Sequence, residues 1–324
     1  MHRFTNKKGD GPLRWIGYII LVFMTLLLFV VTLLSSVSVD PLLTPFLFMI
    51  ILGIVIESLK AIPLMVDSKD SMQIFLMTVI SVLGGALATY IVSVYLELGA
   101  IVAAGLVGII AASTVKKYAV EVYCGAFVGM VSPAVLHDFS HTFLAGLIAG
   151  VIYYLSRDTF KGYGGRLGTI AFASWIIMTL ISNVQLLDTI HEWRTFGGSI
   201  VVYSFGAALI TYILSLRLKN GTVMASSIVT LTGGLILPAV HGSSAGVLAG
   251  VVTAASFVGM SSKEKMNSEF EIAFSSIIMS IMFIYSANHF SGAGGKLGTL
   301  AFGSVVSARG ILFLMKKAAH RRPQ

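Results

Sequence analysis

The sequence predicts an all-α, polytopic membrane protein with about 12 transmembrane helices: two leading helices followed by a 5+5 inverted-topology repeat. Three observations support this fold class. The composition is 56% hydrophobic and only 11% charged, which lies outside the range of soluble domains. Apolar runs of membrane-spanning length begin near the amino terminus. A glycine-rich phrase occurs twice, as FKGYGGRLGTIAFAS at 160–174 and FSGAGGKLGTLAFGS at 290–304.

The two leading helices are predicted at 15–66, one over 15–37 and one over 41–66. Each run exceeds the roughly 20 residues that a helix needs to cross about 30 Å of hydrocarbon. The first run follows a basic segment, 1–14, and is too long for the apolar core of a signal peptide, so we expect an uncleaved anchor. The single cysteine, Cys124, excludes an internal disulfide.

Shorter apolar segments, separated by polar or glycine-rich breaks, predict ten further helices. They lie near 71–95, 98–114, 118–136, 141–156, 167–184, 196–217, 220–238, 242–260, 268–287 and 298–315. Several of these segments are shorter than a complete span. One or two could therefore be re-entrant half-helices, which line cavities in transporters.

The distribution of basic residues supports this helix count, because lysine and arginine accumulate in cytoplasmic loops. With the amino terminus inside, 18 of the 22 basic residues fall in predicted cytoplasmic segments, Arg194 and Lys296 fall outside, and Lys60 and Arg309 fall within spans. We therefore expect a multi-pass protein of the inner (cell) membrane with both termini, including the basic tail 316–324, in the cytoplasm. The net charge of +8 follows from this topology and indicates no nucleic-acid partner.

The repeated phrase is part of a longer internal similarity. Residues 127–174 align with 257–304 at an offset of 130, and residues 84–93 align with 206–215 at an offset of 122. The second copy therefore contains an insertion of about eight residues. The segment PAVHGSSAG at 238–246 is the best candidate for this insertion.

Two homologous units follow from this similarity, at 71–184 and 196–315, joined by an extracellular or periplasmic connector at 185–195. Each unit contains five predicted spans. Because five is odd, the second unit must enter the membrane from the side opposite to the first. Inverted repeats of this kind occur in many transporters, whose substrate sites lie near the midplane where the repeats meet.

The inverted repeat favours a membrane transporter of a small solute, with the lipid bilayer as its other partner and apolar outer faces that leave room for a homodimer. The architecture resembles that of urea and ammonium channels, which also have five-plus-five inverted repeats. That resemblance implies a passive channel for a small neutral solute as the alternative. A membrane-embedded, lipid-modifying enzyme is a third reading, but the sequence has no catalytic motif. We therefore expect no enzyme activity, no catalytic residue, no metal and no cofactor.

The candidate binding residues lie in the repeated phrase. Glycines permit positive φ and close backbone approach, and a loop that leads into a helix presents free N–H groups and the positive end of the helix dipole. The two predicted cradles for an anionic or phosphate-bearing solute are Gly162, Gly164, Gly165, Arg166 and Thr169, and Gly292, Gly294, Gly295, Lys296 and Thr299. Alternatively, the glycines serve turns and close helix packing, Arg166 sets the topology, and Lys296 lies at the surface.

Four further residues are secondary candidates. Glu57 and Lys60 stand at i and i+3 on one predicted helix; charges at this depth are functional candidates by default, and a local structural ion pair is the alternative. Glu121 could carry a proton or cation, or lie near the headgroups. His241, in the insertion, could act at a gate between broken helices or lie in a plain extracellular turn.

Overall fold

The computed structural model describes residues 11–37, 39–62, 71–132, 135, 138–182, 197–217, 221–242 and 245–319. Within these residues the chain is α-helical, with one π-helical turn, one 3-10 turn and no β-strand. The predicted connector 185–195, with Arg194, lies outside the described residues, as do 1–10, 63–70 and 320–324.

The described residues form twelve α-helices, one in each segment predicted to be helical. Their bounds are α1 Gly11–Val37, α2 Thr44–Lys60, α3 Met72–Tyr90, α4 Ala100–Thr114, α5 Ala119–Gly129, α6 Phe139–Ser156, α7 Arg166–Ser182, α8 Gly197–Leu216, α9 Thr222–His241, α10 Ala245–Gly259, α11 Glu269–Tyr285 and α12 Lys296–Ala319. The π-helical turn η1, Ile91–Tyr95, extends α3, and the 3-10 turn η2, Lys116–Tyr118, precedes α5.

Six of these helical segments are long and apolar enough to cross a membrane: α1, α3 with η1, α6, α8, α9 and α12. The helices α4, α7 and α10 are apolar but shorter. These features are consistent with a helical membrane protein.

Two helices end earlier than the hydrophobic pattern predicts. The helix α2 ends at Lys60 and not at 66, and α5 ends at Gly129 and not at 136. With 11 residues, α5 is about 16 Å long. Beyond α5 the chain contacts a distant segment, because the amide of Ser132 donates to the carbonyl of Gly292 at 3.0 Å. The Ser132 amide thus bonds to a distant segment, whereas in a longer α5 it would bond to the carbonyl four residues earlier.

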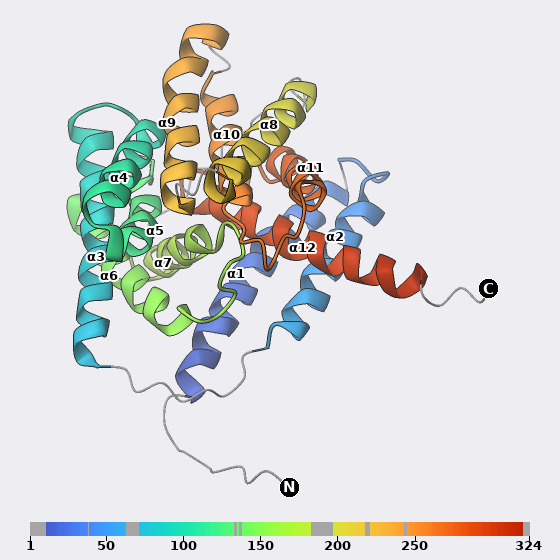
Figure 1. Cartoon of the computed structure of the whole chain (residues 1–324), viewed down its shortest axis with the longest axis horizontal. Helices are drawn as coiled ribbons and strands as arrows, with labels where there is room; N and C mark the ends of the chain where they lie inside the picture. Colours follow the sequence, from blue (N-terminus) through green and yellow to red (C-terminus); the bar gives the residue numbers. More distant parts are fainter. Residues whose placement is uncertain are drawn as a thin grey trace, which may run out of the picture.

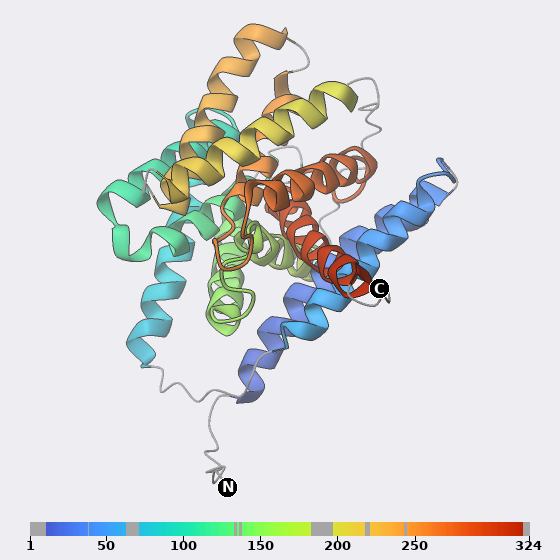
Figure 2. The same ribbon diagram turned by 45° about the vertical axis from the view of Figure 1, so that its right-hand side comes forward.

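Equivalent helices of the two predicted units pack in the same way (Figure 1). The helix α3 packs on α5 and α6, and α8 packs on α10 and α11. Between the units, α4 packs on α9, and α7 crosses α12 near the centre of the molecule. The leading helices α1 and α2 lie side by side at one edge, where α2 packs along α12 (Figure 2).

The crossing of α7 and α12 depends on glycine. A Cβ atom added to Gly168 would lie 2.5 Å from the Cα of Gly298, and a Cβ on Gly298 would lie 2.5 Å from the Cα of Gly168. Because carbon atoms in contact are about 3.5–4.0 Å apart, a side chain at either position would push the two helices away from each other.

The glycine loops, 160–165 and 290–295, contact each other's units reciprocally. Gly164 lies against backbone carbonyls of Phe257 and Val258, and Gly294 lies against those of Phe127 and Val128. Corresponding residues have the same left-handed conformation, with φ of 51° and 54° at Phe160 and Phe290, 84° and 81° at Gly162 and Gly292, and 80° and 87° at Gly165 and Gly295. The two sequence copies therefore have one backbone shape.

The extra residues of the second copy lengthen α9 and α10, which have 20 and 15 residues, whereas their counterparts α4 and α5 have 15 and 11. Gly99 and Gly221 precede α4 and α9 with φ of 78° and 76° and are 122 residues apart, whereas the ends of α5 and α10, at Gly129 and Gly259, are 130 apart. The additional segment extends α9 to His241, past Pro238 within the helix. Residues 243–244 lie outside the described residues.

Candidate functional site

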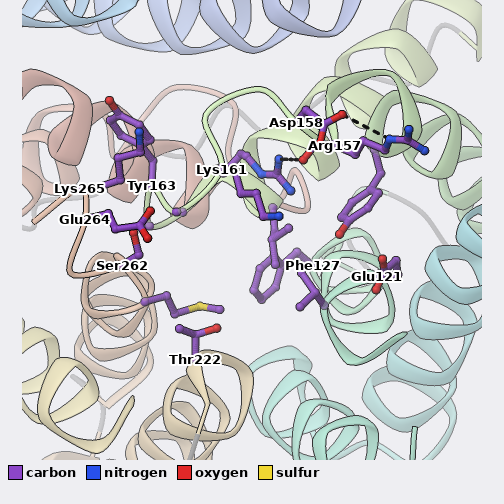
Figure 3. A pocket seen from close by; sticks show the side chains of 18 of the residues that line it. Glu121, Phe127, Arg157, Asp158, Lys161, Tyr163, Thr222, Ser262, Glu264 and Lys265 are labelled. Carbon is purple, nitrogen blue, oxygen red and sulfur yellow. Dashed lines mark hydrogen bonds and ion pairs between the residues drawn. The ribbon is translucent and has the colours of Figure 1, made fainter. Parts of the chain in front are cut away.

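A cavity of about 830 Å³, here called the basic cavity, lies between the start of α5, the loop from α6 to α7 and the segment after α10 (Figure 3). Its volume is within the range of small-molecule sites. Its charged lining residues are mostly basic: Lys117, Arg157, Lys161, Arg166, Lys263 and Lys265, against Glu121, Asp158 and Glu264. The local excess of positive charge favours an anion over a cation.

Aromatic side chains close the basic cavity toward the interior. Phe127, which lines the cavity, packs on its repeat counterpart Phe257 with ring centroids 4.4 Å apart. Both rings are buried. Lys161 extends toward Phe127 in Figure 3. The cavity therefore ends at an aromatic contact between the two predicted units.

Arg166 is buried in the wall of this cavity. Its Nη1 donates to the carbonyls of Ser156 at 3.1 Å, Arg157 at 2.9 Å and Thr159 at 3.0 Å. These carbonyls lie at the carboxyl end of α6 and just beyond it, where backbone acceptors lack partners inside the helix. The guanidinium also lies 5.5 Å from the ring centroid of Tyr153. Arg166 makes no ion pair with any described carboxylate.

Lys296 contacts the end of α11 as Arg166 contacts the end of α6. Its Nζ donates to the carbonyls of Ser286 at 2.7 Å and Ala287 at 3.1 Å. Only 8% of Lys296 is exposed, so the alternative of a surface lysine is wrong. Lys296 does not line the basic cavity. Each basic residue thus turns back to the preceding helix of its own unit, and only Arg166 faces this cavity.

Several groups of the predicted cradles have partners inside the protein. The amide of Gly164 donates to Ser261 Oγ at 3.1 Å, and the amides of Gly168 and Thr169 donate to the carbonyl of Gly165 at 3.0 and 3.3 Å. In the second loop, Thr299 donates to Gly295 through its amide at 3.0 Å and its hydroxyl at 3.2 Å. The remaining guanidinium donors of Arg166 and the cavity lysines are therefore better placed for an anion than these loop amides.

The predicted pair of Glu57 and Lys60 is confirmed, with Lys60 Nζ 2.9 Å from Glu57 Oε2. The structure adds two partners that sequence reasoning missed. Arg309 Nε donates to Glu57 Oε1 at 2.8 Å, and the Tyr163 hydroxyl donates to the same oxygen at 2.6 Å. We call these four residues the ion cluster. A signal for Arg309 existed, since it is the other basic residue predicted within a span and such residues require a partner.

The ion cluster adjoins one edge of the basic cavity. Tyr163 lines the cavity beside Lys265, whose Nζ lies 5.2 Å from the Tyr163 ring centroid (Figure 3). Arg309 also donates through Nη1 to the backbone carbonyl of Lys265. The cluster therefore joins α2 and α12 to the loop from α6 to α7, through Tyr163, and to the segment after α10, through Lys265.

The other secondary candidates lie apart from each other. Glu121, in the first turn of α5, lines the basic cavity. His241 lies at the end of α9, and its Nε2 is 2.5 Å from the Tyr203 hydroxyl. Because Thr222, at the opposite end of α9, lines the basic cavity, His241 is distant from that site.

No protein-family model matches this chain, and searches of curated proteins and of solved structures find no match. The function is therefore inferred from the geometry of the chain itself.

Proposed function

We propose that this protein is an inner-membrane transporter that moves a small anionic or phosphate-bearing solute through a site between two inverted five-helix units. The main observation that supports the proposal is that Arg166 is buried in the wall of the basic cavity. An arginine remains charged in such surroundings. A charge that lacks a carboxylate partner attracts an anion more strongly where the effective dielectric constant is low.

Reciprocal contacts support the inverted repeat, with units at 71–184 and 196–315. Gly164 approaches α10 as Gly294 approaches α5, and Gly168 and Gly298 approach each other. Reciprocal contacts of this kind are expected between two units that are related by a two-fold axis. If each unit crosses the membrane five times, the axis lies in the membrane plane, as in known transporters with inverted repeats.

The charge distribution supports a cavity that opens to the cytoplasm. All six basic residues of the cavity belong to the segments that the positive-inside rule assigns to that side. The contact between Phe127 and Phe257 would then separate a solute in the cavity from the opposite side of the membrane. Transport would require this contact to open.

A passive channel for a small neutral solute is the second candidate. It is favoured by the hydrogen bonds of Arg166 and Lys296 to backbone carbonyls, which give both residues a structural role without any ligand. In that case the positive charge of Arg166 is dispensable for permeation, provided that the end of α6 retains a donor.

The internal repeat supplies a matched control for the test. Lys296 performs in one unit the contacts that Arg166 performs in the other. Arg166→Lys should therefore keep both the contacts and the charge, whereas Arg166→Gln keeps a donor and removes the charge. Purified protein in liposomes is assayed for uptake of phosphate, sulfate and small carboxylates, and of urea and glycerol as neutral solutes.

We expect wild-type protein and Arg166→Lys to take up an anion. Arg166→Gln should lose roughly 10- to 100-fold in anion affinity, since a hydrogen bond to a charged group contributes about 1.5–3 kcal/mol. A folded Arg166→Gln variant with unchanged anion uptake would contradict the proposal. Uptake of neutral solutes alone, unaffected by Arg166→Gln, would establish the channel.

A further inference from the structure

The helix α9 runs from the basic cavity to a second hollow. Thr222, Ser226, Thr230, Gly234 and Pro238 recur every four residues, and because four residues turn an α-helix by about 40° more than one full turn, they form a row that winds along the helix. Thr222 lines the basic cavity. Gly234 and Pro238 line the second hollow, of about 290 Å³, which lies between the start of α4 and the start of α10. We call it the apolar hollow.

The neighbouring helix α10 also extends from one space to the other. Ala245, Ala249, Thr253, Ser256 and Met260 are spaced by three or four residues and lie along one side. Ala245 and Ala249 line the apolar hollow, and Met260 lines the basic cavity. Two adjacent helices, α9 and α10, thus connect the same two spaces.

Four hydroxyl groups lie between the two spaces. The hydroxyl of Tyr123 is 3.0 Å from Ser226 Oγ, Ser226 Oγ is 2.9 Å from Ser256 Oγ, and Thr230 Oγ1 is 3.1 Å from Ser256 Oγ. All four side chains are fully buried. We call them the hydroxyl cluster. Tyr123 belongs to the first predicted unit and the other three residues to the second, so the cluster lies at the interface between units.

The chemistry of the hydroxyl cluster suits a passing solute. A hydroxyl both donates and accepts hydrogen bonds, so the cluster can exchange its internal bonds for bonds to the oxygen atoms of an anion that has left water. Ser227 Oγ, buried next to Ser226, has no hydrogen-bond partner within the described residues. Gly108 of α4 leaves the space that Ser227 and the Tyr123 ring occupy, because a Cβ there would overlap both.

We infer that the hydroxyl cluster is the central binding site of the translocation route and that the apolar hollow is the vestibule on the far side of the membrane. The inference rests on the proposed function and adds to it the route and the groups that hold the solute. From Ala249 to its end at Gly259, next to Met260, α10 advances by about 15 Å, and from Thr222 to Gly234, α9 advances by about 18 Å. The closed part of the route is thus little more than half of about 30 Å of hydrocarbon.

Cysteine accessibility tests the route without knowledge of the solute. In a Cys124→Ala background, which removes the single native cysteine, the route variants are Thr222→Cys, Thr230→Cys and Ala249→Cys. The matched control is Ser204→Cys on α8, where the native serine is equally buried and donates to the Ser276 carbonyl at 3.0 Å. The probe is methanethiosulfonate ethylsulfonate, a small membrane-impermeant anion, added to oriented vesicles from either side.

We expect Thr222→Cys to react from the cytoplasmic side only, and Ala249→Cys from the opposite side only. Thr230→Cys should react from at least one side, at least tenfold faster than Ser204→Cys. The route is overturned if Thr230→Cys is inert from both sides, or if Ser204→Cys reacts equally fast.

Solute flux separates failure of the route from failure of the proposed function. Thr230→Val removes a cluster hydroxyl and should reduce phosphate uptake about tenfold. Thr32→Val on α1 is the control, because the equally buried Thr32 hydroxyl donates to the Leu28 carbonyl of its own helix at 2.7 Å; it should leave uptake within about twofold. Unchanged uptake in Thr230→Val contradicts the route alone. A wild-type protein that moves none of the anions, although Thr230→Cys reacts, contradicts the proposed function.

Discussion

Replacing Gly168 by alanine should weaken the contact between α7 and α12, the crossing helices of the two predicted units. The added Cβ would lie 2.5 Å from the Cα of Gly298 and 3.0 Å from the carbonyl oxygen of Gly295. Normal contact requires about 3.5 Å, so α7 and α12 must separate by about 1 Å at their crossing. Overpacking in a well-packed core costs about 1–3 kcal/mol.

The matched control for this substitution is Gly206→Ala on α8. Gly206 is also helical, but a Cβ there would meet no heavy atom within 4 Å. Alanine exceeds glycine in helix propensity by about 1 kcal/mol, so Gly206→Ala should be neutral or stabilising. The assay is thermal unfolding of both variants in the same detergent.

For a loss of about 2 kcal/mol, the midpoint for Gly168→Ala should fall by roughly 4 °C, because large domains lose about 2 °C for each kcal/mol. The midpoint for Gly206→Ala should not fall. An unchanged midpoint for Gly168→Ala would show that the helices do not cross at these glycines, and would refute the reasoning. Equal losses in both variants would refute it too, since they would reflect glycine replacement in general.

Three further predictions concern buried polar contacts. Glu57→Gln should cost about 2–4 kcal/mol of stability, because it leaves Arg309 without its carboxylate; the double variant Glu57→Gln/Arg309→Met should recover part of this loss in the same assay. Tyr163→Phe should cost about 2 kcal/mol, the contribution of a hydrogen bond to a charged acceptor, and Glu57→Gln should abolish most of this effect. Trp175→Phe should cost about 1–2 kcal/mol, because it leaves the buried carbonyl of Val128 without the indole donor that lies 2.9 Å away, whereas an unchanged unfolding midpoint would contradict that bond.

Helix positions could be predicted because long apolar runs and an internal repeat are visible in the sequence. Helix ends were predicted less well. The helix α5 ends at Gly129 where the following chain bonds to Gly292 of the other unit, and this contact joins residues that are 160 positions apart. Hydrophobicity reports which segments are apolar and carries no information about such contacts.

The candidate site was predicted in part. The i,i+3 spacing of Glu57 and Lys60 indicated their ion pair, but Tyr163 and Arg309 are 106 and 252 residues from Glu57. The sequence predicts Arg166 in a loop that presents the amino end of the following helix to an anion, whereas its side chain contacts the carboxyl end of the preceding helix. The glycine loop turns the chain back so that Arg166 can reach the end of α6. This turn depends on backbone angles that the spacing of the glycines in the sequence does not specify.

The hydroxyl cluster could not be recognised from the sequence. Serine and threonine are common in membrane helices, where they bond to their own backbone or to neighbouring helices. Both Ser256 and Ser304 donate to a carbonyl of their own helix. Only the packing of α5, α9 and α10 distinguishes Ser256, because it brings the Ser226 hydroxyl to 2.9 Å from Ser256 Oγ.

The most direct test of the inverted repeat is the sidedness of the two glycine loops. Lys161 and Asn288 are exposed and lie in corresponding loops, whereas Ser291 is only 7% exposed and unsuitable for labelling. In a Cys124→Ala background, Lys161→Cys should react with an impermeant maleimide from the cytoplasmic side, and Asn288→Cys should react only from the opposite side. Reaction of both cysteines from the same side would contradict the inverted arrangement and the transport route built on it.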